Sequence, residues 1–318
     1  MTSPAPQPVS RVVALGGGHG LARALAALRR LGLAPTAVVT VADDGGSSGR
    51  LRRDLDIIAP GDLRMALLAL ARNRPLAAAL EHRFARGQLE GHALGNLLLV
   101  ALAEQAGGDF VAALDNAAAL LDCAGRVLPA TGDAVQLKAQ VAGEQVDGQV
   151  SVATAQGRIE RVWLEPEDPA VCAGAAEAVR SADLVVLGPG SLFTSVIATL
   201  LVPGLAEALT AASCRVVYIA NILTQPGETS DLDAAAHVEA LLAHVPGLAL
   251  DAVILHDGPQ RPGSGQPLGT RLDDPRAGAV VRADVVARDH DGRVGWGHDP
   301  GRLAAALAPL VDRTASRA

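Results

Sequence analysis

Short apolar runs rich in β-branched residues alternate along the chain with longer segments of helical periodicity. Five runs have the length and composition of buried strands, and they cover residues 11–15, 37–41, 183–187, 216–220 and 252–256. After the first run, Leu21, Leu25, Leu28 and Leu31 recur at helical spacing. Strands without polar alternation, separated by helices, are typical of parallel sheets covered on both faces. The pattern therefore predicts an α/β fold with a Rossmann-like, doubly wound, mainly parallel sheet.

Helices are expected wherever apolar residues recur at this spacing after a capping or turn signal. They are predicted at 60–71, 75–83, 97–106, 109–123, 169–181, 231–244 and 299–311. A polar segment rich in proline and glycine, residues 257–275, separates the last predicted strand from the last helix.

The middle of the chain has a different pattern. Residues 135–141 and 149–154 alternate apolar and polar positions with period two, and residues 159–164 form another candidate strand. We expect a small β-rich insertion at about 126–165, within a single domain that spans 11–318. The proline-rich residues 1–10 are predicted to be a flexible tail.

The composition of the chain disfavours nucleic-acid-binding and membrane-spanning proteins. Hydrophobic residues make up 49% of the 318, so the chain can fill a core, but aromatic residues make up only 2%, which disfavours base-stacking surfaces. A net charge of −7 gives no basic footprint for nucleic acid. No apolar run approaches the roughly 18 residues of a membrane span, and no secretory signal is visible. Three widely spaced cysteines suit reduced thiols in a cytoplasmic protein.

The first predicted strand leads into a glycine-rich turn and then a helix. The turn comprises Gly16, Gly17, Gly18, His19 and Gly20. Bare backbone N–H groups at a helix start can hold a phosphate. The dinucleotide fingerprint is incomplete, however, because Leu21 or Arg23 stands where its third glycine or alanine belongs, and the P-loop signature is absent. A tight turn with no ligand is the alternative interpretation.

The segment after the second strand concentrates the most polar chemistry, and we interpret it as the loop at the centre of the site. Its candidate ligand-binding residues are Asp43, Asp44, Gly45, Gly46, Ser47, Ser48 and Arg50. Adjacent residues of an extended segment point to opposite sides, so only one of the two carboxylates is expected to hold a metal ion such as Mg²⁺, and we assign Asp44. In the alternative interpretation, one carboxylate caps the loop and the other is solvated. Arg50 serves equally well for a diphosphate or for surface ion pairs.

Further polar residues follow other predicted strands or begin helices. They are His92, Asn96, Gly188, Pro189, Gly190, Ser191, Thr194, Asn221, Thr224 and Gln225. Since ligands of open α/β sheets bind at the carboxyl ends of the strands, these segments should converge on one crevice. His92 and Asn96 have a structural alternative, in which they cap and cross-link the start of a helix. Arg64 is expected to be structural.

Eight motifs occur in an order that resembles one known family. They are GGGHG (16–20), TVADDGGSSGRLR (40–52), PGDLR (60–64), GHALGN (91–96), RVLPAT (126–131), LEPED (164–168), LGPGSLFTS (187–195) and NILTQPGET (221–229). Together they resemble the YvcK-type gluconeogenesis factors, a branch of the 2-phospho-L-lactate transferase-like (CofD-like) proteins. The resemblance runs from about residue 11 to residue 310, and ADDGGSSGRLR points to the YvcK branch rather than to the transferases.

This resemblance implies a Rossmann-like core and a cytoplasmic protein needed for cell shape and wall growth on gluconeogenic carbon sources. Members of the branch bind UDP-sugars such as UDP-N-acetylglucosamine, whereas the transferases move a phospholactyl group from a nucleotide-activated donor to a deazaflavin with a divalent metal. The UDP-sugars and the nucleotide-activated donor both contain a nucleotide diphosphate. The chain departs from the usual pattern at His19, where threonine is common, and at Met65, where asparagine is common. It departs again at 230–232 and at 256–258.

Three hypotheses of function follow. The first is a nucleotide-sugar-binding regulatory factor without turnover, which suits the absence of an obvious nucleophile–base pair. The second is a Mg²⁺-assisted phospholactyl transferase, in which the protein supplies mainly position and charge. An NAD-dependent dehydrogenase is the third, and it depends only on the strand–turn–helix layout. No catalytic residue is assigned. The alanine-rich helices suggest a homodimer.

Overall fold

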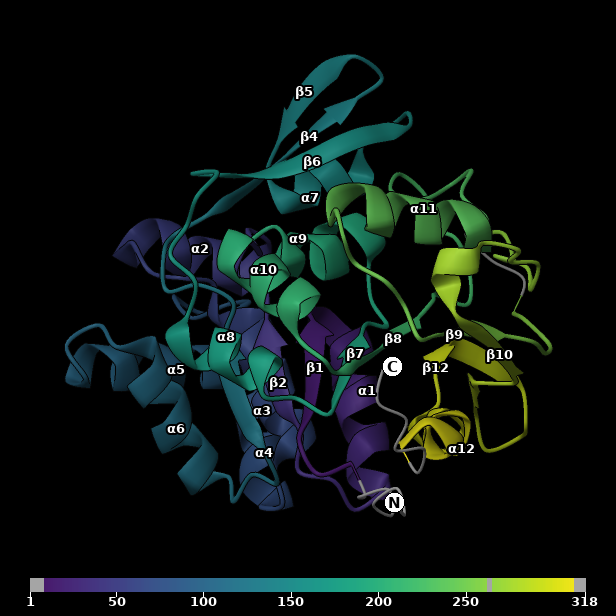
Figure 1. Cartoon of the computed structure of the whole chain (residues 1–318). Helices are drawn as coiled ribbons and strands as arrows, with labels where there is room; N and C mark the ends of the chain where they lie inside the picture. Colours follow the sequence, from purple (N-terminus) through teal and green to yellow (C-terminus); the bar gives the residue numbers. More distant parts are fainter. Residues whose placement is uncertain (1–8, 262–264, 312–318) are drawn as a thin grey trace, which may run out of the picture.

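The computed structural model describes residues 9–261 and 265–311, and a seven-stranded sheet lies at its centre (Figure 1). In sheet order the strands are β10 (Ala279–Ala283), β9 (Ala252–His256), β8 (Arg215–Ile219), β7 (Leu184–Leu187), β1 (Val12–Gly16), β2 (Thr36–Val39) and β3 (Arg126–Pro129). All neighbouring pairs are parallel. The chain winds outward from β1 to β3 and, in the opposite direction, from β7 to β10. The predicted Rossmann-like, doubly wound fold is confirmed.

The fully buried strands could be predicted from the sequence because burial on both faces requires a continuous apolar run. Every residue of β1, β7 and β9 is buried, and these strands coincide with the continuous apolar runs to within a residue or so. β10 lies at the edge of the sheet and is only partly buried, so its sequence carries no such run. Neither β10 nor the antiparallel hairpin of β11 (Val286–Arg288) and β12 (Val294–His298) was predicted.

Helices cover both faces of the sheet. The α-helices outside the central insertion are α1 (Gly18–Arg30), α2 (Gly46–Leu55), α3 (Pro60–Leu70), α4 (Arg74–Glu81), α5 (Leu94–Gln105), α6 (Phe110–Leu120), α8 (Ala173–Arg180), α9 (Ala198–Leu200), α10 (Pro203–Ala211), α11 (Ala234–His244) and α12 (Pro300–Val311). A π-helix, η1 (Leu192–Ile197), precedes α9, and a 3₁₀ turn, η2 (Pro275–Ala277), precedes β10. α1 packs against α3 and α12, whereas α8 packs against α10. Crossovers between parallel strands are right-handed, and the chain crosses the sheet in opposite directions in its two halves. These two groups of helices therefore lie on opposite faces of the sheet.

The central insertion is smaller than predicted and partly helical. It contains β4 (Gln136–Val141), β5 (Glu144–Asp147) and β6 (Ile159–Glu165), which form a separate antiparallel sheet in the order β5-β4-β6. Residues 126–129 belong instead to the main sheet as β3. The predicted strand at 149–154 is wrong, because these residues form helix α7 (Gln149–Thr154). Figure 1 shows α7 between the insertion sheet and the core.

Of the predicted flexible tail, residues 1–8 lie outside the described part of the chain. Val9 is buried, and Ser10 donates hydrogen bonds from its N–H and its hydroxyl to the carboxylate of Asp183. Among the described residues, no single helix is long and apolar enough to cross a membrane. The segments Leu192–Leu200 and Pro203–Ala211 meet the length and composition criteria only as a pair, and that pair bends by 75°.

Candidate functional site

The glycine turns after β1 and β7 pack directly against each other at the point where the strand order reverses. A Cβ atom on Gly20 would overlap the carbonyl group of Pro189, and one on Gly16 would lie 3.9 Å from the Cα of Gly188. Gly188 also has a φ of +73°, a conformation that favours glycine. Close approach of two backbones therefore accounts for part of the glycine content that suggested a phosphate site.

A carboxylate occupies the start of helix α1. The side chain of Asp62, which is 7% exposed, accepts a hydrogen bond from the N–H of Gly18. Burial and, to a smaller extent, the Asp43 carboxylate raise the pKa of Asp62 to about 7, although the Gly18 N–H opposes the shift. The helix predicted at 60–71 is α3, which begins at Pro60 and includes Asp62. The carboxylate of Asp62 thus serves a helix more than 40 residues earlier in the sequence.

Asp43 and Asp44 point to different parts of the molecule. Asp43 Oδ1 accepts the N–H of Gly45 at 2.9 Å, and burial raises the pKa of Asp43 although this bond and the Ser48 hydroxyl oppose the shift. Asp44 Oδ1 accepts the N–H of Val150 at 3.0 Å and so caps α7 of the insertion. The expectation that the two carboxylates diverge agrees with this geometry. The structure places Asp43, rather than Asp44, beside the candidate site.

The segment interpreted as a loop forms helix α2 from Gly46 onward, with Gly45 as its N-cap. Gly49 allows this turn to form, because a Cβ atom there would overlap the carbonyl group of Asp44. Within the described chain, no acceptor is found for the N–H groups of Gly46, Ser47 and Ser48. A helix start of this kind favours anions.

A buried chain of hydrogen bonds ties α2 to α3 and α5. Arg64 Nε donates to Asn96 Oδ1 at 2.9 Å, Asn96 Nδ2 donates to Ser47 Oγ at 3.1 Å, and Ser47 Oγ lies 3.1 Å from His92 Nδ1. Desolvation and the nearby Arg50 guanidinium lower the pKa of His92. His92 and Asn96 each contact the Ser47 hydroxyl, so both cross-link elements near the start of α5, as in their structural alternative.

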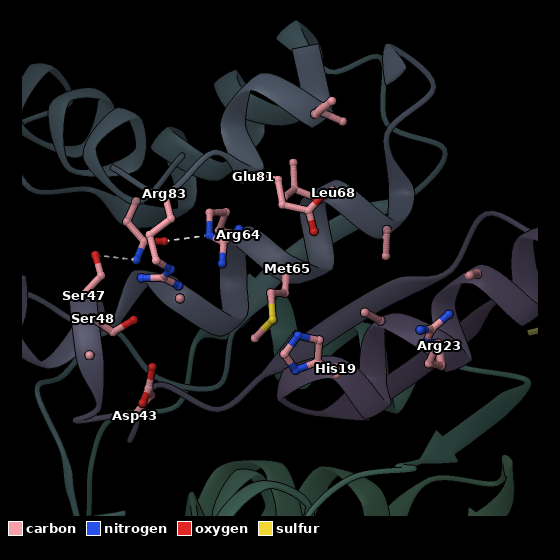
Figure 2. Close-up of a pocket in the computed structure, with 18 of the residues that line it drawn as sticks. His19, Arg23, Asp43, Ser47, Ser48, Arg64, Met65, Leu68, Glu81 and Arg83 are labelled. Carbon is pink, nitrogen blue, oxygen red and sulfur yellow. Dashed lines mark hydrogen bonds between the residues drawn. The ribbon is translucent and has the colours of Figure 1, made fainter. Parts of the chain in front are cut away.

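These elements surround a cleft of about 990 Å³, which we call the α1–α3 cleft (Figure 2). It lies between the outward faces of α1 and α3, and α2 and α4 complete its walls. The lining residues that the sequence predicted are His19, Asp43, Gly45, Gly46, Ser47, Ser48 and Asn96. In Figure 2 the imidazole of His19 and the thioether of Met65 lie next to each other midway along the cleft. Two of the four departures from the family pattern thus meet at one place.

The cleft is rich in arginine although the protein is acidic. Its arginines are Arg23, Arg29, Arg30, Arg64, Arg74 and Arg83. None of them forms an ion pair with a carboxylate of the described residues, whereas nine arginines elsewhere do. The lining also includes two acidic side chains, Asp43 and Glu81, which are outnumbered by the six arginines. The arrangement favours an anionic ligand.

The other predicted residues are absent from the cleft lining, and eight of them lie around the loops after β7 and β8: Gly188, Pro189, Gly190, Ser191, Thr194, Asn221, Thr224 and Gln225. Gln225 links two of them, since it accepts from Asn221 Nδ2 at 3.0 Å and donates to Ser191 Oγ at 2.9 Å. Thr224 is bonded through its N–H and its hydroxyl to Gln266. The buried carboxylate of Glu228 accepts from the N–H groups of Phe193 and Thr194 at 2.7 and 3.0 Å.

Sequence reasoning missed the role of Asp62, the arginines of the cleft and Glu228. Asp62 and Glu228 are the internal partners of the two helix starts that follow the glycine turns, and no local signal reveals such a distant contact. Arg64 was interpreted as structural, which its bond to Asn96 supports, but it also lines the cleft. Arg50 lies outside the cleft, where it donates to the carbonyl group of Glu90 at 2.8 Å.

The protein offers a divalent cation two carboxylates at this site, which is fewer ligands than the cation needs to complete its coordination. No cluster of three or more His, Cys, Asp or Glu side chains suited to a metal occurs in residues 9–261 or 265–311. Asp43 and Asp62 lie close enough for one charge to raise the pKa of the other. Mg²⁺ is usually held by one or two carboxylates together with ligand phosphates, so the pair fits such an ion.

Comparisons with known proteins identify the family of the chain. The sequence model of the family described as 2-phospho-L-lactate transferase CofD matches residues 12–269. A relative from Mycobacterium tuberculosis is 47% identical over 316 residues, which cover 95% of this chain and 90% of the relative. The "Gluconeogenesis factor" of Bacillus subtilis is 43% identical over 249 residues, 77% of this chain and 78% of its own.

The fold is similar to a crystal structure of a UPF0052 family member from Bacillus halodurans. The TM-score is 0.86 and the sequence identity is 37%, over 94% of this chain and 99% of that one.

Proposed function

Because the chain belongs to the 2-phospho-L-lactate transferase CofD family, we propose that it is a cytoplasmic nucleotide-sugar-binding factor that takes a UDP-N-acetylglucosamine-like ligand. The resemblance to gluconeogenesis factors supports a role in cell shape and wall growth under gluconeogenic conditions. One observation carries the proposal: a cleft that begins at the carboxyl edge of the sheet is lined both by arginines without an ion pair and by the start of α2, which has no side-chain cap.

The diphosphate is assigned to the start of α2. The N–H groups of Gly46, Ser47 and Ser48 face no internal acceptor, and Arg64 and Arg83 line the same end of the cleft. The start of α1 is a poorer phosphate site than its glycines suggested, because the carboxylate of Asp62 already accepts the Gly18 N–H. The sugar would then extend along α1 past His19.

The residues around the β7 and β8 loops suit the nucleoside. Asn221, Gln225 and Ser191 form a hydrogen-bonded chain beside the second glycine turn, which packs against the first. Amide groups can donate to and accept from the edge of a base. We assign these side chains to the base or the ribose.

Calorimetry with UDP-N-acetylglucosamine tests the proposal. We expect saturable binding, weakened about tenfold or more by Arg83→Gln, because a charge-assisted bond to phosphate is worth roughly 1.5–3 kcal/mol. Arg86→Gln is the matched control, since this arginine is exposed, close in sequence and outside the cleft lining. Absence of binding at millimolar concentration would refute the proposal, as would equal losses in the two variants.

A metal-assisted transferase is the second candidate, and the neighbouring Asp43 and Asp62 carboxylates favour it. A cation held by this pair would neutralise a diphosphate, while Arg64 and Arg83 would stabilise the charge of a transferred phosphoryl group. Product formation from a nucleotide-activated phospholactate and a deazaflavin, abolished by Asp43→Asn but retained in Asp44→Asn, would support it. Lack of turnover with every donor tested would exclude this second function.

A further inference from the structure

Three of the arginines without an ion pair line the part of the α1–α3 cleft that is farther from the diphosphate end. Arg23 and Arg30 belong to α1, and Arg74 begins α4. All three are exposed at the cleft wall. Arg23 and Arg30 have no hydrogen-bond or ion-pair partner among the described residues, whereas Arg29 donates to the carbonyl groups of Ala69 and Ala71. The cation nearest the diphosphate end is Arg23.

Distances along α1 show what each arginine can reach. A helix rises 1.5 Å per residue, so Arg23 lies about 6 Å along the axis from His19, and Arg30 lies about 16 Å from it. In Figure 2, Arg23 is on the opposite side of His19 and Met65 from Asp43 and Arg64. A carboxylate attached to a sugar ring lies within a few ångströms of the ring, which puts it within reach of Arg23 but not of Arg30.

The wall between these cations leaves room for a ligand. Its side chains are small, since Ala22 and Ala26 face the cleft from α1 and Ala69 faces it from α3. One carboxylate, that of Glu81, stands at the rim against the arginines, so the local charge at this end remains positive. A neutral sugar would leave Arg23 without an anionic partner.

We propose that the cleft prefers, among nucleotide sugars, those whose sugar carries a carboxylate, and that Arg23 binds this carboxylate. Guanidinium and carboxylate groups can pair through two parallel hydrogen bonds, which gives this contact its selectivity. The inference depends on the proposed function, because it takes the diphosphate to lie at the start of α2. It adds the chemical class of the sugar and the residue that selects it.

UDP-glucuronate and UDP-glucose form a matched pair for the test, because they differ only in the oxidation of C6 to a carboxylate. Calorimetry at low ionic strength should show UDP-glucuronate binding about tenfold more tightly to the unaltered protein, as expected for one charge-assisted contact. In Arg23→Gln this preference should fall to about twofold or less, with little change for UDP-glucose. Arg53→Gln, an exposed position of α2 outside the cleft lining, controls for the general loss of a positive charge.

The outcomes separate the inference from the function on which it depends. Equal affinity of the unaltered protein for the two sugars, or a preference that survives in Arg23→Gln, would overturn the inference while leaving nucleotide-sugar binding intact. An equal loss of preference in Arg53→Gln would also overturn it, since the effect would then be one of net charge. If neither sugar nor UDP-N-acetylglucosamine binds, the proposed function itself fails. Thermal unfolding of each variant verifies that it is folded.

Discussion

The carboxylate of Asp62 in α3 accepts a hydrogen bond from the backbone N–H of Gly18, the first residue of α1. This contact places a buried, titratable acid at the switch point of the sheet, beside Asp43. It also fills the helix start that a glycine-rich turn usually offers to a phosphate. The candidate anion site consequently lies one strand away, at the start of α2.

Asp62→Asn should stabilise the protein at neutral and higher pH. The pKa of Asp62 in the folded state, about 7, exceeds that of an unfolded aspartate, so the folded state binds more protons and its stability falls as pH rises from about 4 to 7. Asparagine keeps an acceptor for the Gly18 N–H without the charge. The free energy of unfolding of the Asp62→Asn variant should exceed that of the unaltered protein by roughly 1–3 kcal/mol at pH 8, and by less at pH 4.5.

Urea denaturation at the two pH values measures this difference. Asp183→Asn is a suitable contrast, because the Arg11 side chain holds the pKa of Asp183 well below its usual range. That substitution should destabilise the protein at pH 8. An Asp62→Asn variant that is less stable than the unaltered protein at pH 8 would contradict the assignment of a destabilising buried charge.

Asp44→Ala should loosen the insertion without removing ligand binding. The lost cap of α7 costs roughly 0.5–2 kcal/mol of local stability, since Asp44 Oδ1 accepts the Val150 N–H at 3.0 Å. Hydrogen exchange should become faster in residues 149–154 and stay unchanged in α12. Mg²⁺-dependent nucleotide binding should persist in Asp44→Ala and be lost in Asp43→Asn. The reverse result would show that Asp44, rather than Asp43, holds the metal ion.

The two glycine turns should tolerate a methyl group very differently. In Gly20→Ala the new Cβ would overlap the carbonyl group of Pro189, and relief of this overlap should cost roughly 1–3 kcal/mol. In Gly190→Ala the nearest atom would be 3.5 Å away, so the free energy of unfolding should change by at most about 0.5 kcal/mol. Thermal or urea unfolding of both variants decides the point. Equal stabilities would mean that the turns do not pack as described.

His19→Thr combined with Met65→Asn should alter ligand affinity more than stability. His19 is exposed and Met65 is partly buried at the middle of the cleft, so unfolding should change little. Threonine and asparagine can each hydrogen-bond a sugar hydroxyl, which is worth about 0.5–1.5 kcal/mol per bond. Binding of UDP-N-acetylglucosamine should tighten at least about threefold. An unchanged Kd would remove these two positions from ligand selection.

Strands and long helices could be predicted because their signals are local. β7 and β9 are apolar throughout and fully buried, and α3 begins at a proline. α2 was missed because Gly46, Ser47, Ser48 and Gly49 have weak helix propensity, and tertiary contacts around Gly61 hold this helix.

Helix α7 was mistaken for a strand for a related reason. Its sequence alternates with period two, but only Val152 is buried, and the cap from Asp44 comes from a residue more than 100 positions earlier. Some polar residues of the cleft, such as Asp43, Ser47 and Ser48, could be predicted because they follow the end of a strand. Which of them face the cleft depends on partners such as Asp62 and Glu228, whose contacts no sequence pattern encodes.

A crystal structure with UDP-N-acetylglucosamine and Mg²⁺ tests the central claim most directly. The account predicts the diphosphate at the start of α2, within hydrogen-bonding distance of the N–H groups of Gly46–Ser48 and the guanidinium groups of Arg64 and Arg83. It predicts the cation between Asp43 and Asp62, and the sugar beside His19 and Met65. A diphosphate and sugar bound outside the α1–α3 cleft, or a cleft that remains empty at saturating ligand, would contradict it.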